Sequence, residues 1–178
     1  MKYFDELKRS MNFLAEDPRV VFIGQAVAVK GTAMTNTLKE VAPEKKIELP
    51  VAEEMQMGMT GGMALTGLIP VSVFPRWNFL LCAINQLVNH LDKIPVMSNG
   101  GYKTKAIIRT GIGSQRPLHP QHQHIGDFTE AITRCCTTID VIRLEEPEDI
   151  FPAYKLALER EDGRSTIVVE YGDFYNEK

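Results

Sequence analysis

The sequence predicts an α/β fold: a three-layer sandwich with a mostly parallel central sheet and helices on both of its faces. Two observations support this prediction. Short β-branched segments alternate with longer helical patterns from one end of the chain to the other, and such alternation is typical of a parallel sheet. The 178 residues contain no internal repeat and no convincing linker, so residues 1–178 are expected to form a single domain with one substantial core.

The first half of the chain supplies three predicted strands. One face of an amphipathic helix is formed by Phe4, Leu7, Met11 and Leu14. The predicted elements that follow, in order, are a strand at 20–24, a short helix at 35–42, a strand at 46–50, a helix at 53–67 and a strand at 69–75. Each strand is thus separated from the next by a helix.

The second half continues the alternation. Its predicted elements, in order, are a helix at 78–94, a turn at 97–102, a strand at 105–110, a loop at 111–126, a helix at 127–136, a strand at 139–144, a helix at 147–160 and a strand at 166–171. Open parallel sheets bind ligands at the carboxyl ends of their strands. We therefore expect functional residues in the loops that begin at Gly24, Pro50 and Arg109.

Composition argues against several classes of function. The chain is 44% hydrophobic and 24% charged with a net charge of −3, which gives no basic surface for nucleic acid. It has no apolar run of the roughly 18 residues that a membrane span needs, and its start lacks the apolar core of a secretory signal, so we expect a cytoplasmic protein. The cysteines, Cys82, Cys135 and Cys136, form no CxxC pair and are expected to be buried reduced thiols.

Two adjacent acids, Glu53 and Glu54, precede a helix rich in Met, Gly and Ala that has almost no other charge. One interpretation is that both acids stabilise the helix start, which is worth about 0.3 to 1 kcal/mol. The glycines inside the helix, Gly58, Gly61 and Gly62, favour another interpretation. Each costs about 1 kcal/mol relative to Ala, which indicates close approach of another backbone. An acid at such a dry interface is a usable proton donor or acceptor.

The same region resembles the pyrimidine-binding domain of thiamine diphosphate enzymes, specifically the amino-terminal half of the beta subunit of 2-oxoacid dehydrogenases, and more distantly the middle domain of transketolase. The segment that resembles it most is LPVAEEMQMGMTGGMALTGLIPVSVFPRWNFLLCAINQLVN. The likeness continues in order over nearly the whole chain through DPRVVFIGQAV, MSNGG, AIIRTGIG, a QH pair, PEDIFPAYKLAL and IVVEY. The resemblance implies a thiamine diphosphate-binding fold with a single pyrimidine-binding domain.

The resemblance also implies roles for individual residues near the cofactor. In the family, the acid of the P-[IV]-[AS]-E motif contacts N1′ of the aminopyrimidine, which here corresponds to Glu53. A carboxyl there favours the imino tautomer, whose 4′ nitrogen takes the proton from C2 of the thiazolium. The aromatic ring against the pyrimidine corresponds to Phe79, with Trp77 as second candidate and a core position as the alternative for both. Gln25 stands where many beta subunits have an acid and retains hydrogen-bonding capacity.

Three of the four histidines, His119, His122 and His124, lie in the loop at 111–126. Their spacing in a proline-broken loop does not match the usual zinc patterns, so we expect no metal site there. The resemblance matches Gln121-His122 to a QH pair of the family and implies that His122 is catalytic and lines the substrate channel. His119 and His124 are expected to assist in that channel. The alternative is a solvated polar loop.

A partner subunit is implied by what the sequence lacks. Thiamine enzymes bind the diphosphate through Mg²⁺ and a GDG motif followed by NN, and neither motif is present. The family's carboxyl-terminal domain is absent from the sequence as well. The resemblance therefore implies an alpha-type partner that carries GDG…NN and Mg²⁺, thiamine diphosphate shared across the interface, and an α2β2 assembly in which the chain also self-associates.

The leading hypothesis is a beta-type subunit of a thiamine diphosphate-dependent dehydrogenase or decarboxylase. Such an enzyme decarboxylates a 2-oxoacid and transfers or releases the remaining fragment, and this chain would be active only with its partner. One alternative is a split transketolase-like subunit that moves two-carbon units between sugar phosphates, although the strand-end loops lack clustered Arg and Lys. The other is a non-catalytic scaffold subunit, for which an acid at Glu53 beside an aromatic residue would be unnecessary.

Overall fold

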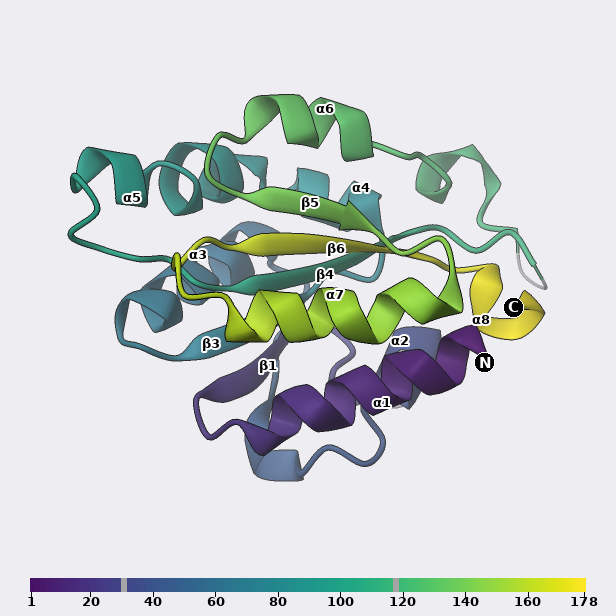
Figure 1. Cartoon of the computed structure of the whole chain (residues 1–178). Helices are drawn as coiled ribbons and strands as arrows, with labels where there is room; N and C mark the ends of the chain where they lie inside the picture. The colour runs from purple at the N-terminus through teal and green to yellow at the C-terminus, as the bar shows by residue number, and fades with distance from the viewer. Residues whose placement is uncertain (30–31, 117–118) are drawn as a thin grey trace.

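The computed structural model describes residues 1–29, 32–116 and 119–178. Within them, six strands form one sheet in the order β2-β1-β3-β4-β6-β5, and every neighbouring pair is parallel (Figure 1). The strands are β1 (Val20–Gly24), β2 (Lys46–Glu48), β3 (Ile69–Val73), β4 (Ile107–Ile112), β5 (Asp140–Arg143) and β6 (Thr166–Tyr171). The predicted fold class is confirmed, and the sheet is parallel throughout.

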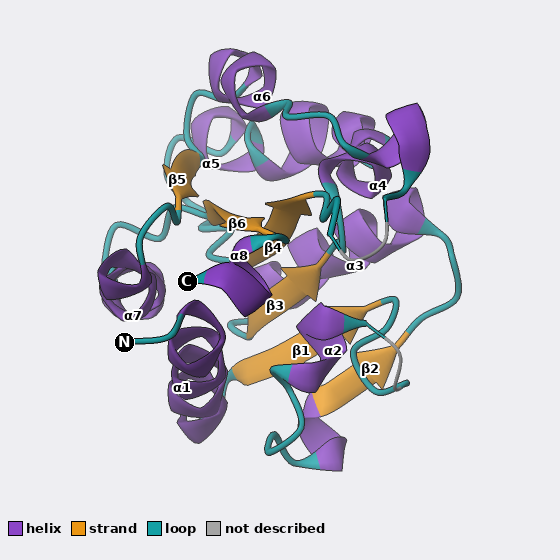
Figure 2. Cartoon of the chain, turned by 90° about the vertical axis from the view of Figure 1, so that its right-hand side faces the viewer, coloured by secondary structure: helices purple, strands orange, loops and turns teal. Residues whose placement is uncertain are grey.

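Helices lie on both faces of this sheet. The α-helices are α1 (Tyr3–Glu16), α2 (Ala33–Asn36), α3 (Glu53–Leu65), α4 (Trp77–Leu81), α5 (Ile94–Met97), α6 (Thr129–Cys135), α7 (Pro147–Glu159) and α8 (Phe174–Glu177). Shorter segments are the 3-10 turns η1 (Pro43–Lys45) and η3 (Gln121–His124) and the π-helical segment η2 (Gln86–Leu91). Figure 2 shows α1 and α7 on one face and α3, α4 and α6 on the other. Across the described residues, no helix has both the length and the apolar character needed to cross a membrane.

Two separate hydrophobic cores lie on the two faces of the sheet. Alternate residues of a strand point to opposite faces, so β4 and β6 contribute to both cores. Ile107 and Val168 share one core with residues of α1 and α7, whereas Ile108 and Val169 share the other with residues of α4, η2 and α6. Burial on both faces explains why the rest of these strands is mostly apolar, and the charged residues Arg109 of β4 and Glu170 of β6 are buried as a pair.

The prediction of one continuous helix at 78–94 is wrong, because the structure divides this segment into α4, η2 and α5. The N–H of Asp92 donates to the carbonyl of Leu87, five residues back, which is the wide turn of a π-helix. The helix is interrupted there because the carboxylate of Asp92 binds the N–H groups of Thr137 and Thr138 in a distant loop. These partners are invisible to a local pattern.

The helix predicted at 35–42 is displaced and shortened. The side chain of Thr32 accepts a hydrogen bond from the N–H of Thr35 and so caps α2 two residues earlier than expected. The chain then turns, and Leu38 and Val41 pack into the core that contains residues of α1 and α7. The remaining predicted elements correspond to observed ones with bounds that differ by a few residues at most, which is within the usual uncertainty of element ends.

The expected burial of the cysteines is wrong for two of them. All three cysteines have free thiols, but Cys82 and Cys135 are exposed and only Cys136 is partly buried. Burial raises the pKa of the Cys136 thiol to about 12, which makes it unreactive near neutral pH. Cys82 follows the short helix α4 on its solvent side, a position that the apolar sequence around it does not reveal.

Candidate active site

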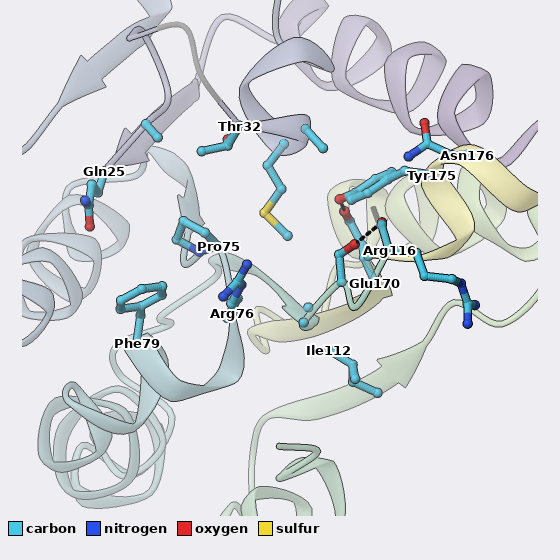
Figure 3. Close-up of a pocket in the computed structure, with 17 residues that line it drawn as sticks. Gln25, Thr32, Pro75, Arg76, Phe79, Ile112, Arg116, Glu170, Tyr175 and Asn176 are labelled. Carbon is cyan, nitrogen blue, oxygen red and sulfur yellow. Dashed lines mark hydrogen bonds between the residues drawn. The ribbon is translucent and has the colours of Figure 1, made fainter. Parts of the chain in front are cut away.

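A cavity of about 440 Å³ opens at the carboxyl edge of the sheet, where we expected the functional loops (Figure 3). Its wall is formed by the segments that follow β1, β3, β4 and β6, and by residues of α2 and α8. Among the side chains that line it are Gln25, Arg76, Phe79 and Glu170. A volume of this size is typical of a site for a small molecule.

Glu53 begins α3 at the same edge of the sheet, although it is not part of the cavity wall. One turn along the helix, the buried amide of Gln56 donates to Ser72 Oγ and to the carbonyl of Val73, both at 3.0 Å. Thr60, another turn along, is hydrogen-bonded to Ser72 at 2.9 Å. These buried bonds fix the first turns of α3 against β3 and therefore fix the position of Glu53.

The two adjacent acids have different surroundings. Glu54 is exposed and accepts hydrogen bonds from Asn85 Nδ2 at 3.1 Å and from Gln86 Nε2 at 3.5 Å. Glu53 is half-buried, and its carboxylate has no hydrogen bond or ion pair to any described residue. Glu54 thus has a structural role between α3 and η2, and Glu53 is available for a ligand.

The structure separates the two candidate aromatic residues. Phe79 is half-buried and lines the cavity. Trp77 is fully buried in the core that contains residues of α4, η2 and α6, and its Nε1 has no acceptor among the described residues. Phe79 is therefore the ring that a ligand in the cavity can contact.

His124 is the histidine that the structure brings to this aromatic wall. Its imidazole stacks on Phe79 with ring centroids 5.2 Å apart and an interplanar angle of 27°. His119 and His122 are exposed on the same loop. The loop approaches β4 closely because residue 113 is glycine: a Cβ on Gly113 would lie 1.9 Å from the carbonyl oxygen of His124.

Gln25 lines the cavity from the end of β1, in a loop that is held by a carboxylate. The residue before it, Gly24, has φ +148°, and a Cβ there would lie 2.5 Å from the carbonyl oxygen of Val73. Further along the loop, the N–H groups of residues 26–29 all donate to Glu48, at 2.6 to 3.3 Å. Burial of Glu48 acts against its ionisation, but these four bonds lower the pKa of the carboxyl.

The side of the cavity formed by the end of β6 contains a buried ion pair. Glu170 accepts hydrogen bonds from Arg109 Nε at 2.5 Å and Nη2 at 3.0 Å, and both side chains are completely buried. The hydroxyls of Tyr154 and Tyr175 also donate to Glu170. Burial acts to lower the pKa of Arg109, but the negative charge of Glu170 outweighs it and the pKa is raised. The charge of Glu170 is therefore balanced within the chain.

Sequence reasoning missed Arg76, which lines the cavity next to Phe79. It is half-buried, and desolvation lowers the pKa of its guanidinium. Among the described residues, Arg76 forms no ion pair, so no carboxylate oxygen lies within 4 Å of its guanidinium nitrogens. The available signal was its place directly after β3, since strand-end loops were the expected location of the site.

These residues fit an aminopyrimidine ring in their chemistry. Glu53 has an uncommitted carboxylate, Phe79 a flat aromatic face, and His124 a buried Nδ1 that has no partner among the described residues. Asn78 Oδ1 is a further buried acceptor without a partner in that part of the chain. Such atoms are uncommon in a finished protein interior and indicate a ligand or a missing partner. Within residues 1–29, 32–116 and 119–178, no three His, Cys, Asp or Glu side chains could together hold a metal ion.

One face of α3 is open to solvent although it is apolar. Met55 is 46% exposed and Leu65 43% exposed, and between them lie the exposed glycines Gly58 and Gly62. A Cβ on Gly62 would meet no atom within 4 Å. Of the three glycines that we expected to pack against another backbone, Gly61 is buried, where a Cβ would lie 3.8 Å from Leu91, and a Cβ on Gly58 would lie 3.8 Å from Gln86. Only Gly62 meets no described atom, and we call residues 55, 58, 62 and 65 the outer face of α3.

The chain is similar in sequence to a known family and to several curated proteins. Residues 8–173 match the family described as transketolase, pyrimidine binding domain. The beta subunit of the pyruvate dehydrogenase E1 component of Gracilaria tenuistipitata var. liui is 27% identical over 179 residues, covering 98% of this chain and 54% of the relative. The 2-oxoisovalerate dehydrogenase subunit beta of Bacillus subtilis (strain 168) is 26% identical over 166 residues, covering 91% and 50%.

A solved structure agrees with these matches at the level of fold. A chain described as split gene transketolase, inactive beta4 tetramer, superposes with a TM-score of 0.73 at 16% sequence identity, over 94% of this chain and 50% of that chain. This likeness extends to the fold alone. The chain spans about half the length of the curated relatives described above.

Proposed function

The chain belongs to the family of transketolase pyrimidine-binding domains, and on this basis we propose that it is a beta-type subunit of a thiamine diphosphate-dependent 2-oxoacid dehydrogenase or decarboxylase. The observation that supports this most is Glu53. Its carboxylate stands at the carboxyl edge of the sheet, is fixed through Gln56, and has no partner among the described residues. Glu54 beside it is hydrogen-bonded to η2.

When bound, thiamine diphosphate supplies a nucleophilic carbon that adds to the keto group and accepts the electron pair released by decarboxylation. Glu53 would hold a proton at the ring nitrogen N1′ of the aminopyrimidine. Phe79 contributes an aromatic face that orients a flat ring and excludes water from it. Gln25, at the end of β1, is within the same cavity and offers an amide to polar atoms of the ligand.

His124 takes the place that we first assigned to His122. It stacks on Phe79, and its buried Nδ1 has no partner within the described residues, whereas His122 is exposed. An imidazole there is suited to donate a proton to the carboxylate or carbonyl oxygen of a 2-oxoacid. The two histidines are two positions apart, so the QH pair of the family is equally well matched by Gln123-His124.

The active form requires an alpha-type partner. The sequence has no GDG…NN motif to bind the diphosphate and Mg²⁺, and the outer face of α3 is an exposed apolar surface. A partner on this surface would complete the cofactor site by supplying the ligands for the diphosphate and Mg²⁺. We propose an α2β2 assembly, in which the cofactor lies between unlike subunits.

The test compares two neighbouring acids in the complex of this chain with its partner. Glu53→Gln should lower turnover about 10² to 10⁴-fold, the usual contribution of a positioned proton-transfer group. Glu54→Gln, the matched control, should keep most of the turnover because Glu54 only joins α3 to η2. CO₂ release from 2-oxoacids is the measurement. Equal turnover in Glu53→Gln and the wild type would refute the proposed function.

A further inference from the structure

Arg76 occupies an unusual position for a residue without an ion-pair partner. It precedes α4 with extended backbone (φ −152°, ψ 157°) and lines the cavity. In Figure 3 its guanidinium lies between Phe79 and Glu170. Its Cδ lies 3.6 Å from the position that a Cβ on Gly113 would occupy, so its stem passes close to the backbone at the end of β4. The side chain is therefore confined by the cavity wall.

The charges of the cavity do not cancel. The charged residues that line it are Arg76, Arg116 and Glu170. Glu170 is neutralised by Arg109. Arg116 points out of the cavity, where it is paired with Glu177 at 2.5 Å and with Asp173 at 3.7 Å. Among the described residues this leaves one uncompensated positive charge, on Arg76.

Such a charge does not assist folding. Desolvation lowers the pKa of the Arg76 guanidinium, and no described carboxylate offsets that cost. A partly desolvated arginine at the end of a parallel strand is instead suited to bind an anionic group of a ligand, because its planar fork donates two parallel hydrogen bonds to a carboxylate or phosphoryl group. The remaining wall supplies the amide of Gln25.

We propose that Arg76 determines substrate specificity by binding a second anionic group of the substrate, at the end away from the reacting keto carbon. The inference rests on the proposed function, and it then names the substrate class: a 2-oxoacid that carries a second carboxylate. Arg76 acts on recognition of the substrate and takes no part in proton transfer. The reaction itself is unchanged, since the 2-oxoacid loses CO₂ from the carboxyl group next to the keto carbon.

The test uses pairs of 2-oxoacids of equal chain length with the complex of this chain and its partner. The pairs are 2-oxoglutarate with 2-oxopentanoate and oxaloacetate with 2-oxobutyrate, and CO₂ release is measured with ferricyanide as electron acceptor. The wild type should favour the dicarboxylate in at least one pair. Arg76→Gln should lower kcat/KM for that dicarboxylate roughly 10- to 100-fold, mainly through KM, since a charge-assisted hydrogen bond is lost.

Two variants separate recognition from structure. Arg76→Lys should recover part of the preference, because lysine keeps the charge and loses the fork. Arg134→Gln removes a charge from the exposed face of α6, where Arg134 pairs with Glu130, and should leave the preference unchanged. Thermal unfolding of Arg76→Gln should match the wild type, since no partner is left unpaired. Loss of the complex on size exclusion would assign Arg76 to the subunit interface and overturn the inference.

The outcomes also distinguish this inference from the proposed function. An equal loss for dicarboxylates and their uncharged counterparts in Arg76→Gln would mean that Arg76 binds the shared carboxyl group, which overturns the inference alone. A wild type that prefers 2-oxopentanoate and 2-oxobutyrate would do the same. If none of the four acids releases CO₂ while xylulose 5-phosphate is cleaved in an Arg76-dependent reaction, the 2-oxoacid assignment fails and the inference fails with it.

Discussion

Glu170 is a buried carboxylate whose stabilising role can be tested separately from the cavity it lines. It binds Arg109 through two hydrogen bonds and accepts the hydroxyls of Tyr154 and Tyr175. Glu170→Gln would leave the completely buried guanidinium without its counter-charge. We expect the free energy of unfolding in urea to fall by about 3 to 5 kcal/mol, the usual cost of breaking a buried pair from one side.

The matched control for Glu170 is an exposed acid in an ion pair. Glu130 pairs with Arg134 at 3.0 Å along α6, and both side chains are 78% exposed. Glu130→Gln should change the free energy of unfolding by less than about 0.5 kcal/mol, because such a pair is well solvated and screened. Similar losses in the two variants would mean that the buried network contributes no more than a surface contact.

Individual candidate site residues could be selected from the sequence only where a local motif points to them. Glu53 and Phe79 each follow a strand within a recognisable segment, and the structure leaves both accessible to a ligand. His122 was selected because the QH pair of the family was matched to Gln121-His122, although the same pair recurs at Gln123-His124. The difference between them arises from the turn η3 and from Gly113, which admits the backbone of His124. Arg76 can be recognised as a candidate only from the structure, which shows that the other charged residues of the cavity are paired and Arg76 is not.

At the scale of elements, the loop after β1 depends on one carboxylate from β2. Glu48 accepts the N–H groups of residues 26–29, and Ala26 is held at φ 59°, a conformation that is uncommon outside glycine. Glu48→Gln removes the charge and half of the acceptor capacity. Amide hydrogen exchange at residues 26–29 should become about 10- to 30-fold faster, because the charged hydrogen bonds that close the loop are weakened.

The control for this loop is Glu44→Gln, which changes an exposed acid in the neighbouring turn η1. Exchange at residues 26–29 should remain at the wild-type rate in that variant. Exchange that is equally slow in Glu48→Gln would show that the loop is held by its packing and not by the carboxylate. Because Gln25 lies at the start of this loop, the same variant is expected to weaken ligand binding in the cavity.

A second carboxylate joins η2 to the loop before β5. Asp92 is fully buried and accepts hydrogen bonds from the N–H groups of Thr137, Thr138 and Ile139. Burial acts to raise the pKa of Asp92, but the ammonium of Lys93 and these hydrogen bonds outweigh it and hold the pKa at about 2. Because the folded pKa lies below the usual value of 3.8, this stabilisation is complete above about pH 5 and is lost as the pH falls toward 2.

Asp92→Asn tests this pH dependence. The free energy of unfolding in urea should be lower for the variant at pH 6, and the difference from wild type should shrink by about 1 kcal/mol between pH 6 and pH 3, as protonation of Asp92 removes its advantage. The comparison with the variant cancels the titration of the other acids. A difference that stays constant with pH would assign the effect of Asp92 to packing alone.

Elements that depend on a local sequence pattern were predicted, whereas those that depend on contacts between residues far apart in the sequence were missed. Strand β1 was located closely because burial makes its sequence VVFIG continuously apolar, and β6 was located by its apolar run from Ile167 to Val169. The break between η2 and α5 was missed because it depends on Asp92 meeting Thr137, 45 positions away. The start of α2 was missed because Thr32 caps it from outside the predicted span.

At the scale of the whole molecule, the open face of α3 links the fold to the assembly. The inner face of this helix is anchored to β3 by Gln56 and Thr60. Its outer face exposes Met55 and Leu65 with glycines between them. Single exposed apolar side chains are normal, but a continuous apolar stripe along a helix is typical of a surface that another chain covers.

The last prediction therefore concerns Gly62→Leu. Since a Cβ at this position meets no atom within 4 Å, the variant should fold, and its stability should be unchanged or higher by up to about 1 kcal/mol because leucine favours a helix more than glycine does. A leucine there would keep a partner backbone from approaching the outer face of α3, so the complex should be lost on size exclusion with light scattering. Glu130→Leu, which adds an exposed leucine to α6, should assemble normally. An intact complex with Gly62→Leu would mean that the partner binds elsewhere.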